Sequence, residues 1–337
     1  MTRPRVAVGS LGGTIAMTSE SGVGVTPSLT ADDLVAAVPG LAEVASLEAV
    51  TLAVLPSASL GYDDCLAALD WARRAVDGGA AGVVLVQGTD TLEETAYLFD
   101  LFWDRPEPLV VTGAMRSPQR PGTDGPANLI AAVTTAAAPA SRDLGVLVVM
   151  NDEIHAAARV AKTDSMDVAA FRSPVFGPLG RLVEGRPVYG NRPARHPALA
   201  LAVGADACPR VALLVTHLGD DGALLRLAVE SGYDGVVLAA LGVGHVSTSV
   251  AEAVSTASEH LPVVFAGRTG GGTTARETYG FTGSERDLIT RGALPAGWLP
   301  PVKVRLLLWT LLRRGCSRAE IAEELLRRGA ASPEVAP

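Results

Sequence analysis

Aromatic residues are scarce in this chain: they make up 4% of its 337 residues, whereas hydrophobic residues together make up 48%. The predicted core is therefore built from small aliphatic side chains, chiefly alanine, valine and leucine, with many glycines. Such side chains suit the closely packed layers of helix and sheet in an α/β fold. The length predicts about two domains.

Cysteine is also rare. Cys65, Cys208 and Cys316 are far apart and odd in number, and none has a cysteine or histidine partner close to it in the sequence. This spacing argues against both a disulfide framework and a zinc site. We therefore expect no metal site and three buried, reduced thiols.

Basic residues are fewer than acidic ones, 28 against 36, so the formal net charge at pH 7 is -8. An acidic chain is a poor partner for nucleic acid, whose phosphates attract lysine and arginine, and it gives no reason to expect an anionic membrane as a partner. No apolar run reaches the length of a transmembrane helix, and the N-terminus lacks the apolar segment of a signal peptide. We expect a soluble, cytoplasmic protein.

Apolar runs that predict strands alternate with patterns that predict amphipathic helices. Val83 to Val86, for example, form a continuous apolar run, as expected for a parallel strand buried on both faces. The alternation predicts an α/β fold with a larger N-terminal domain, 1–190, built on a doubly wound, mostly parallel sheet. A proline-containing linker, 191–209, leads to a smaller C-terminal α/β domain, 210–337. The expected strands are 6–8, 50–55, 83–86, 109–111, 145–150, 211–215, 235–240 and 262–266, and the expected helices include 31–38, 62–76, 222–231, 249–259, 302–313 and 317–328.

Polar side chains follow two of the predicted strands at their carboxyl ends. Thr14 follows two glycines after the first strand, and Thr89 and Asp90 follow Gly88 after the strand that begins at Val83. The carboxyl ends of parallel strands, beside helix N-termini, are where open α/β sheets bind ligands. If the two strands are near neighbours in one sheet, both threonine hydroxyls face one crevice.

Plainer roles are open for several of these residues. A Gly-Gly-Thr turn is often only a loop, and Thr91 fits the N-cap of a helix whose capping box is closed by Glu94. Lys162 stands in a polar segment, 151–173, that interrupts the alternation of strands and helices. Its spacing alone is equally compatible with a solvated surface lysine. The capping box leaves Thr89 and Asp90 without an explanation.

Several short motifs occur in the same order as in one family of enzymes. They are Gly12-Gly13-Thr14-Ile15-Ala16, Gly88-Thr89-Asp90-Thr91, Glu93-Glu94-Thr95-Ala96-Tyr97, Gly113-Ala114-Met115-Arg116, Asp124-Gly125-Pro126-Ala127-Asn128-Leu129, Gly145 to Asp152, Lys162-Thr163, Ser173-Pro174 and Gly177-Pro178-Leu179-Gly180. In this order they resemble bacterial L-asparaginases of the two-domain type with a threonine nucleophile. The resemblance is strong over residues 1–190 and continues more faintly to the terminal helices.

The resemblance implies catalytic roles. Thr14 corresponds to the nucleophile that attacks the side-chain amide, and Thr89 corresponds to a second catalytic threonine. Asp90 and Lys162 would complete a polar relay with Thr89. A threonine hydroxyl is a poor nucleophile near neutral pH and needs such a relay to remove its proton, and a lysine kept neutral by burial beside an aspartate can serve. Backbone N–H groups near Thr89 and Ala114 are expected to stabilise the oxyanion.

The resemblance also implies a substrate and the groups that bind it. L-Asparagine would be hydrolysed to aspartate and ammonia, with no cofactor. Ser57 corresponds to the serine that binds the substrate α-carboxylate, and Asp90 would also take the α-ammonium group. Ala58 stands where the family usually has a glutamine, and Glu277 is the nearest match for an acidic residue that a neighbouring subunit supplies. The implied assembly is a homodimer or a homotetramer.

Other positions depart from the family pattern. Leu11 and Gln87 stand where the family usually has threonine and histidine, and we interpret both as packing changes behind the site. The segment 17–27 lacks the tyrosine that the family places there, and His245 replaces a frequent asparagine of the second domain. Together with Ala58, these changes reshape the substrate rim and predict asparaginase activity with little glutaminase activity.

Two alternative functions are compatible with the sequence. Within amide hydrolysis, glutamine or a D-amino-acid amide is the alternative substrate, whereas the acidic charge argues against the misacylated tRNA on which some relatives act. A non-catalytic amino-acid sensor on the same scaffold is the alternative from another class. Thr14, Thr89, Asp90 and Lys162 together favour the enzyme, because a binder has no use for two threonines and a lysine.

Overall fold

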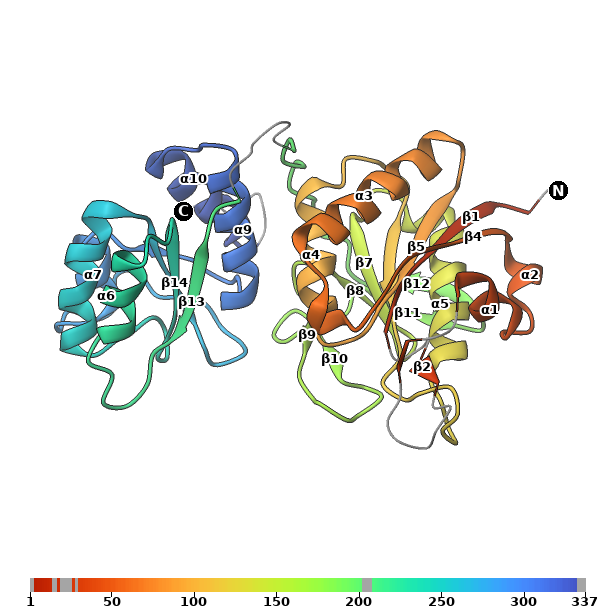
Figure 1. Ribbon diagram of the computed structural model, residues 1–337, viewed down its shortest axis with the longest axis horizontal. Helices are drawn as coiled ribbons and strands as arrows, with labels where there is room; N and C mark the ends of the chain where they lie inside the picture. Colours follow the sequence, from red (N-terminus) through yellow and green to blue (C-terminus); the bar gives the residue numbers. More distant parts are fainter. Residues whose placement is uncertain (1–2, 14–16, 19–25, 28–29, 202–207, 332–337) are drawn as a thin grey trace. The chain divides into compact units, whose positions relative to one another are not determined.

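The computed structural model describes residues 3–13, 17–18, 26–27, 30–201 and 208–331. By its internal contacts the chain divides into unit 1, Met1–Ala198, and unit 2, Leu199–Pro337, and the division falls within the predicted linker. Both units have the predicted α/β architecture (Figure 1). Among the described residues, none of the helices combines the length and the apolar character needed to cross a membrane.

Unit 1 is built on an eight-stranded mixed sheet with the order β12-β11-β8-β7-β6-β5-β1-β4. The five strands from β4 to β7 in this order are parallel, which confirms the prediction of a mostly parallel sheet. The three remaining strands extend the sheet with antiparallel pairs. Their bounds are β1 Arg5–Gly12, β4 Ser46–Leu55, β5 Gly82–Val86, β6 Leu109–Thr112, β7 Val146–Met150, β8 Glu153–Ala156, β11 Gly180–Val183 and β12 Arg186–Tyr189.

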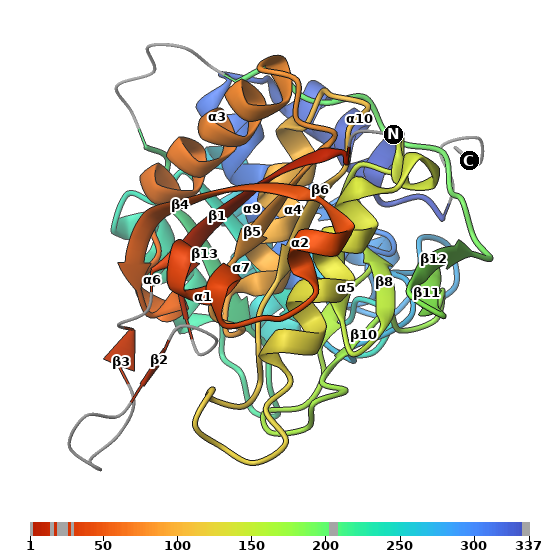
Figure 2. The same ribbon diagram turned by 90° about the vertical axis from the view of Figure 1, so that its right-hand side faces the viewer.

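Helices cover both faces of this sheet, as a doubly wound fold requires. On one face lie α1 (Ala31–Ala36), α2 (Leu41–Val44) and α5 (Gly125–Ala137), whose apolar residues form a common core with alternate residues of the strands. On the other face lie α3 (Tyr62–Asp77) and α4 (Leu92–Phe102). Figure 2 views unit 1 from the side of α1, α2 and α5.

The polar segment 151–173 contains three short strands that were not expected from the sequence. β8 continues the main sheet, and β9 (Ala161–Lys162) pairs with β10 (Phe171–Arg172) in a separate short hairpin. β11 and β12 were also missed, because each is short and mixes polar with apolar residues, so neither contains the continuous apolar run that identified the other strands. A further pair, β2 (Met17–Thr18) and β3 (Thr26–Pro27), follows β1.

Unit 2 has a four-stranded parallel sheet in the order β13-β14-β15-β16. Two of its strands, β13 (Val211–Val215) and β14 (Gly235–Ala240), have the predicted bounds. α6 and α7 share one apolar core with β14 and β15, whereas α9 packs on the sheet separately. The remaining elements are β15 Val263–Gly267, β16 Leu294–Pro295, α6 Ala223–Glu230, α7 Thr248–His260, α8 Glu285–Thr290, α9 Pro301–Arg313 and α10 Arg318–Arg328; β16 and α8 were not predicted.

The three cysteines are free, but only one matches the expected environment. Cys65 lies on the buried side of α3, and burial raises the pKa of its thiol to about 12. The expectation of burial is wrong for Cys208, which is exposed, and for Cys316, which is partly exposed. Cys208 precedes the first strand of unit 2 and Cys316 stands in the turn between α9 and α10, so neither lies on a face that packs against a sheet.

Candidate active site

The carboxyl ends of β1 and β5 meet at the point where the order of the parallel strands reverses. Along the chain the five parallel strands are β1, β4, β5, β6 and β7, but β1 lies between β4 and β5 in the sheet. Open α/β sheets bind ligands in the crevice outside such a switch point, because the connections on its two sides leave in opposite directions. The two motifs that contain the predicted catalytic threonines follow these two strands.

Two glycines allow the end of β1 to approach β5 closely. Gly12 and Gly13 both have positive φ, at 94° and 90°. A Cβ atom on Gly13 would lie 2.0 Å from the backbone nitrogen of Gly88, so only glycine fits between the strand ends. The backbone of residue 13 therefore lies directly against the start of the Gly88-Thr89-Asp90 motif. Thr14, the predicted nucleophile, lies outside the described residues.

Lys162 joins the predicted polar relay. Its Nζ donates hydrogen bonds to Thr89 Oγ1 and to Asp90 Oδ1, each at 2.9 Å. Thr89 is buried and the Lys162 side chain is 16% exposed, whereas the Asp90 side chain is 69% exposed. Lys162 is therefore not the solvated surface lysine that spacing alone allowed. Its amino group links a buried hydroxyl to a carboxylate that faces solvent.

The short hairpin holds Lys162 beside the N-terminus of α4. Lys162 pairs with Phe171 across the β9–β10 hairpin, and its backbone N–H donates to Glu93 Oε1 at 3.2 Å. The next residue, Thr163, donates its N–H to the carbonyl of Ala170. In the sequence Glu93 was only one member of a motif, and in the structure its carboxylate fixes the backbone of Lys162.

Ser57 lies beneath the Thr89-Asp90 segment in a short 3-10 turn, Ser57–Ser59, that follows β4. Its hydroxyl accepts the N–H of Asp90 at 3.2 Å, and the side chain is buried. No described residue accepts the proton of this hydroxyl, so it is available to a ligand. Ala58, the next residue, is exposed.

Thr91 does not form the predicted capping box with Glu94. Thr91 occupies the N-cap position of α4, but its side chain makes no capping hydrogen bond. Its hydroxyl instead donates to the carbonyl of Ser57 at 2.9 Å. The prediction is wrong because the neighbouring turn offers a carbonyl acceptor, and the bond joins the Ser57 turn to the start of α4.

Ala114 is fully buried, and Gly113 before it approaches the Thr89 side chain. The backbone N–H groups of Thr89 and Ala114 donate to no described residue, so both are available as oxyanion donors. Asp124 accepts the N–H groups of Met115 and Arg116, each at 2.9 Å, and holds the segment after Ala114.

Asn128 of α5 also holds the segment that contains Ala114. Its amide donates to the carbonyl of Gly113 at 3.0 Å and accepts the N–H of Asn151 at 2.9 Å. The motif that begins at Asp124 therefore builds the loop that contains Ala114, a task that its residue types alone did not indicate.

Leu11 and Gln87, the two departures next to the threonine motifs, are both buried. The Gln87 amide donates to Thr95 Oγ1 at 3.2 Å and to the carbonyl of Gly88 at 3.3 Å, while its Oε1 has no hydrogen-bond partner among the described residues. These contacts agree with packing behind the site. The segment 17–27, which lacks the family tyrosine, lies largely outside the described residues.

An open hollow of about 320 Å³ lies beside the relay. Asp90 and Lys162 line it together with the three residues that follow Lys162, Thr163, Asp164 and Ser165. The hollow therefore gives solvent, or a small polar ligand, direct access to the exposed carboxylate of Asp90.

The predicted residues Glu277 and His245 belong to unit 2, and Glu277 is exposed. The His245 ring makes edge contacts with Tyr279 and Phe281. Its Nε2 lies 3.2 Å from Oε2 of Glu285, a fully buried carboxylate at the start of α8 that the sequence analysis missed.

Glu285 holds the chain that precedes α8. Its Oε1 accepts the backbone N–H groups of Thr278 and Tyr279, at 2.8 and 2.7 Å. Burial raises the pKa of Glu285, but these hydrogen bonds and the one from His245 lower it further than burial raises it. The resulting pKa lies below the ordinary value, so the buried group stays a carboxylate.

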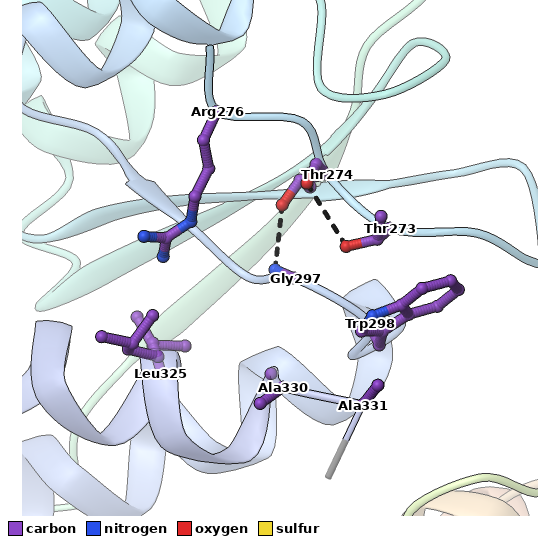
Figure 3. Close-up of a pocket in the computed structure, with 10 residues that line it drawn as sticks. Thr273, Thr274, Arg276, Gly297, Trp298, Leu325, Ala330 and Ala331 are labelled. Carbon is purple, nitrogen blue, oxygen red and sulfur yellow. Dashed lines mark hydrogen bonds between the residues drawn. The ribbon is translucent and has the colours of Figure 1, made fainter. Parts of the chain in front are cut away.

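A second hollow, in unit 2, has a volume of about 190 Å³. Figure 3 shows Arg276, Trp298 and Leu325 around it, and the hydrogen bond from the N–H of Gly297 to Thr274 Oγ1, 2.9 Å long, in its wall. None of the residues predicted for catalysis or substrate binding lines this hollow. The site that the sequence predicted is thus the one at the sheet edge of unit 1.

The chain is similar to known proteins over most of its length. Residues 5–195 match the family model described as asparaginase, N-terminal, and residues 210–325 match the glutaminase/asparaginase C-terminal domain. L-asparaginase 2 of Escherichia coli is 33% identical over 312 residues, which cover 90% of this chain and 88% of that protein. A probable L-asparaginase of Deinococcus radiodurans is 36% identical over 324 residues, which cover 94% of this chain and 96% of that protein.

The fold has a solved counterpart. The crystal structure of a probable cytoplasmic L-asparaginase from Campylobacter jejuni matches with a TM-score of 0.86 at 30% identity, and the match covers 96% of this chain and 99% of that one. The cytoplasmic location expected for the present chain stays a prediction. The two family matches together span nearly the whole length, and the chain therefore belongs to the asparaginase family.

Proposed function

We propose that the protein is an L-asparaginase that hydrolyses the side-chain amide of L-asparagine to aspartate and ammonia. The observation that carries the proposal is the pair of 2.9 Å hydrogen bonds from Lys162 Nζ to Thr89 Oγ1 and Asp90 Oδ1. This relay lies at the carboxyl ends of β1 and β5, next to the glycine pair that precedes Thr14. The names of the relatives support the same substrate.

The proposed reaction proceeds through two acyl-transfer steps. Thr14 Oγ bonds to the amide carbon while its proton passes through Thr89 to the neutral amine of Lys162, which becomes an ammonium group. The carbon–nitrogen bond then breaks, and the nitrogen takes this proton and leaves as ammonia. Water attacks the ester that remains, aspartate leaves, and Thr14 regains its proton. The free N–H groups of Thr89 and Ala114 would stabilise both oxyanions, and one such donor is typically worth about 2.7–4 kcal/mol.

The same site offers groups for the ends of a free amino acid. The unpaired hydroxyl proton of Ser57 would bind the α-carboxylate, and the exposed Asp90 carboxylate would bind the α-ammonium. A peptide lacks one or both of these charged ends, so the pair favours a free amino acid. Ala58 is exposed beside Ser57 and gives the substrate rim no amide, which supports selectivity for asparagine over glutamine.

The test is ammonia release from L-asparagine, L-glutamine and D-asparagine by the wild type and by Thr14→Ala. We expect release from L-asparagine, little from L-glutamine, and none from any substrate with the variant. Thr134→Ala, which removes a threonine hydroxyl from helix α5, is the matched control and should keep full activity.

Each other result would reject part of the proposal. Equal rates on glutamine and asparagine would remove the predicted selectivity, and D-asparagine as the best substrate would change the substrate class. If no substrate releases ammonia but L-asparagine raises the melting temperature, the protein is a sensor.

A further inference from the structure

His155 of β8 is a buried histidine that the proposed reaction does not use. Its side chain is fully buried, its Nδ1 lies 2.9 Å from Ser173 Oγ, and its Nε2 lies 3.4 Å from Oε2 of Glu153. Burying an imidazole without polar partners is costly, so these contacts account for its presence in the core. They also connect the main sheet to the segment that follows the hairpin of Lys162.

The strand register places His155 on the face that faces α4. His155 pairs with Val148 of β7, and its neighbour Ile154 belongs to the core under α5. Successive side chains of a strand point to opposite faces, so His155 points to the face that α3 and α4 cover. α4 also begins on that face, with the Glu93 carboxylate that binds the backbone of Lys162.

Ser173 lies immediately after β10, two residues beyond the partner of Lys162 in the hairpin. Phe171 pairs with Lys162, and Ser173 is buried, with its carbonyl accepting the N–H of Gly177. The bond between His155 and Ser173 therefore fastens one end of the hairpin to β8. A hairpin with two residues in each strand is not stable by itself and needs such external contacts.

Two charged groups lie in a row beside the imidazole. Arg181 of β11 forms an ion pair with Glu153, and Glu153 lies next to Nε2 of His155. We infer the neutral tautomer with its proton on Nε2, the nitrogen nearer this carboxylate, which leaves Nδ1 as the acceptor for the hydroxyl of Ser173. The tautomer that suits Glu153 is thus the one that binds Ser173.

We propose that His155 is a positioning residue for Lys162, acting through Ser173 and the β9–β10 hairpin. The inference rests on the proposed function, in which Lys162 Nζ must reach Thr89 and Asp90 together. Glu93 fixes the backbone of one hairpin strand, and His155 fixes the end of the other. Without the second contact the hairpin shifts, and Lys162 loses the geometry in which both acceptors lie within 2.9 Å.

Two substitutions separate the contacts of the imidazole. The amide of His155→Asn occupies the place of Nδ1 and keeps a partner for Ser173, whereas the amide of His155→Gln reaches the place of Nε2 and loses that partner. Ser173→Ala removes the same contact from the other side by deleting one oxygen. Tyr189→Phe is the control, because it removes another hydroxyl contact of unit 1, the partly buried 2.7 Å bond to Ser141, from β12 at the edge of the main sheet.

The readouts are kcat, KM and amide hydrogen exchange of residues 161–173. We expect His155→Gln and Ser173→Ala to lower kcat by about tenfold or more with little change in KM, because misplacing a catalytic group mainly slows the chemical step. Exchange in the hairpin should become faster in these two variants, while the strands of the main sheet stay protected. His155→Asn should stay close to the wild type in kcat and exchange, and Tyr189→Phe should keep wild-type kcat and hairpin exchange.

Wild-type exchange of the hairpin in both His155→Gln and Ser173→Ala would overturn the inference. Equal losses in His155→Asn and His155→Gln would also overturn it, since they would point to general packing of the imidazole. If the wild type releases no ammonia from asparagine, the proposed function fails, and the exchange experiment still decides whether His155 positions the hairpin.

Discussion

Lysine is a rare residue in this chain. Only Lys162 and Lys303 occur among the 28 lysine and arginine residues, so nearly every cation is an arginine. Arginine cannot be deprotonated in a protein, whereas lysine can give up its proton. Lys162 is one of two lysines in a chain that otherwise uses arginine, and it stands in a polar segment. This rarity was a sequence signal for proton transfer, whereas the spacing of residues gave none.

Lys162→Arg tests whether the relay needs a removable proton. The guanidinium is always charged and can still donate to Asp90, but it cannot act as a base. We expect kcat for L-asparagine to fall by about a hundredfold or more, the usual range for loss of a general base, and Lys162→Met to fall as far. Activity of Lys162→Arg close to that of the wild type would mean that only the charge matters.

Ser57→Ala tests the carboxylate-binding role. Loss of a hydrogen bond to a charged group costs about 1.5–3 kcal/mol, so KM for L-asparagine should rise by about 10- to 100-fold with a smaller change in kcat. Ser59→Ala, at the other end of the same 3-10 turn, is the matched control because its side chain is exposed. Similar KM values for the two variants would remove Ser57 from the substrate site.

At the scale of elements, most strands and turns were predicted from continuous apolar runs and from glycines. Buried parallel strands such as β5 need continuous apolar residues, so their positions could be predicted from sequence. β8, β11 and the β9–β10 hairpin could not be predicted, because their short strands lack a continuous apolar run and depend on contacts such as His155 with Ser173. The capping box predicted for Thr91 was wrong for the same reason, since the carbonyl that accepts its hydroxyl proton lies in a turn 34 residues away.

Gly13→Ala tests the close approach of β1 to β5. Gly13 and Gly40 both have a φ of 90°, but only Gly13 has backbone atoms within 4 Å of the place where a Cβ would lie. Each alanine costs about 1–2 kcal/mol for the left-handed conformation, and Gly13→Ala adds the clash with Gly88. We expect a larger loss of melting temperature than for Gly40→Ala, and a fall in kcat of about a hundredfold. Equal changes of melting temperature and of kcat in Gly13→Ala and Gly40→Ala would show that the contact with Gly88 is unimportant.

Glu285 predicts how the stability of unit 2 depends on pH. Its pKa is lower in the folded chain than its ordinary value of about 4.3, so the unfolded chain binds more protons between these two values. The stabilisation is complete above the unfolded pKa and is lost as the pH falls through the folded pKa. The melting temperature of Glu285→Gln should therefore lie below that of the wild type at neutral pH, and the gap should narrow below about pH 4. Glu252→Gln, an exposed position of α7, is the control, and a gap that does not change with pH would contradict the account.

At the scale of the whole molecule, the described catalytic groups all belong to unit 1, whereas Glu277 and His245 belong to unit 2. The sequence could indicate both sets through motif order, because each motif is local. It could not indicate how many copies of the chain form one site, since that depends on surfaces far apart in the sequence. The homodimer or homotetramer therefore stays a proposal. Its most specific claim is that Glu277 of one copy completes the site of another.

Mixing two inactive variants tests whether a second copy supplies Glu277. Thr14→Ala changes unit 1 and Glu277→Ala changes unit 2, and each alone should lose most activity. If a site combines unit 1 of one copy with unit 2 of another, a hybrid dimer contains one site without either change. Refolding equal amounts together should then restore about a quarter of wild-type activity, because half of the dimers are hybrids and half of their sites are intact. A mixture no more active than the average of the two variants would locate Glu277 outside a shared site, and full activity of Glu277→Ala alone would exclude it from the reaction.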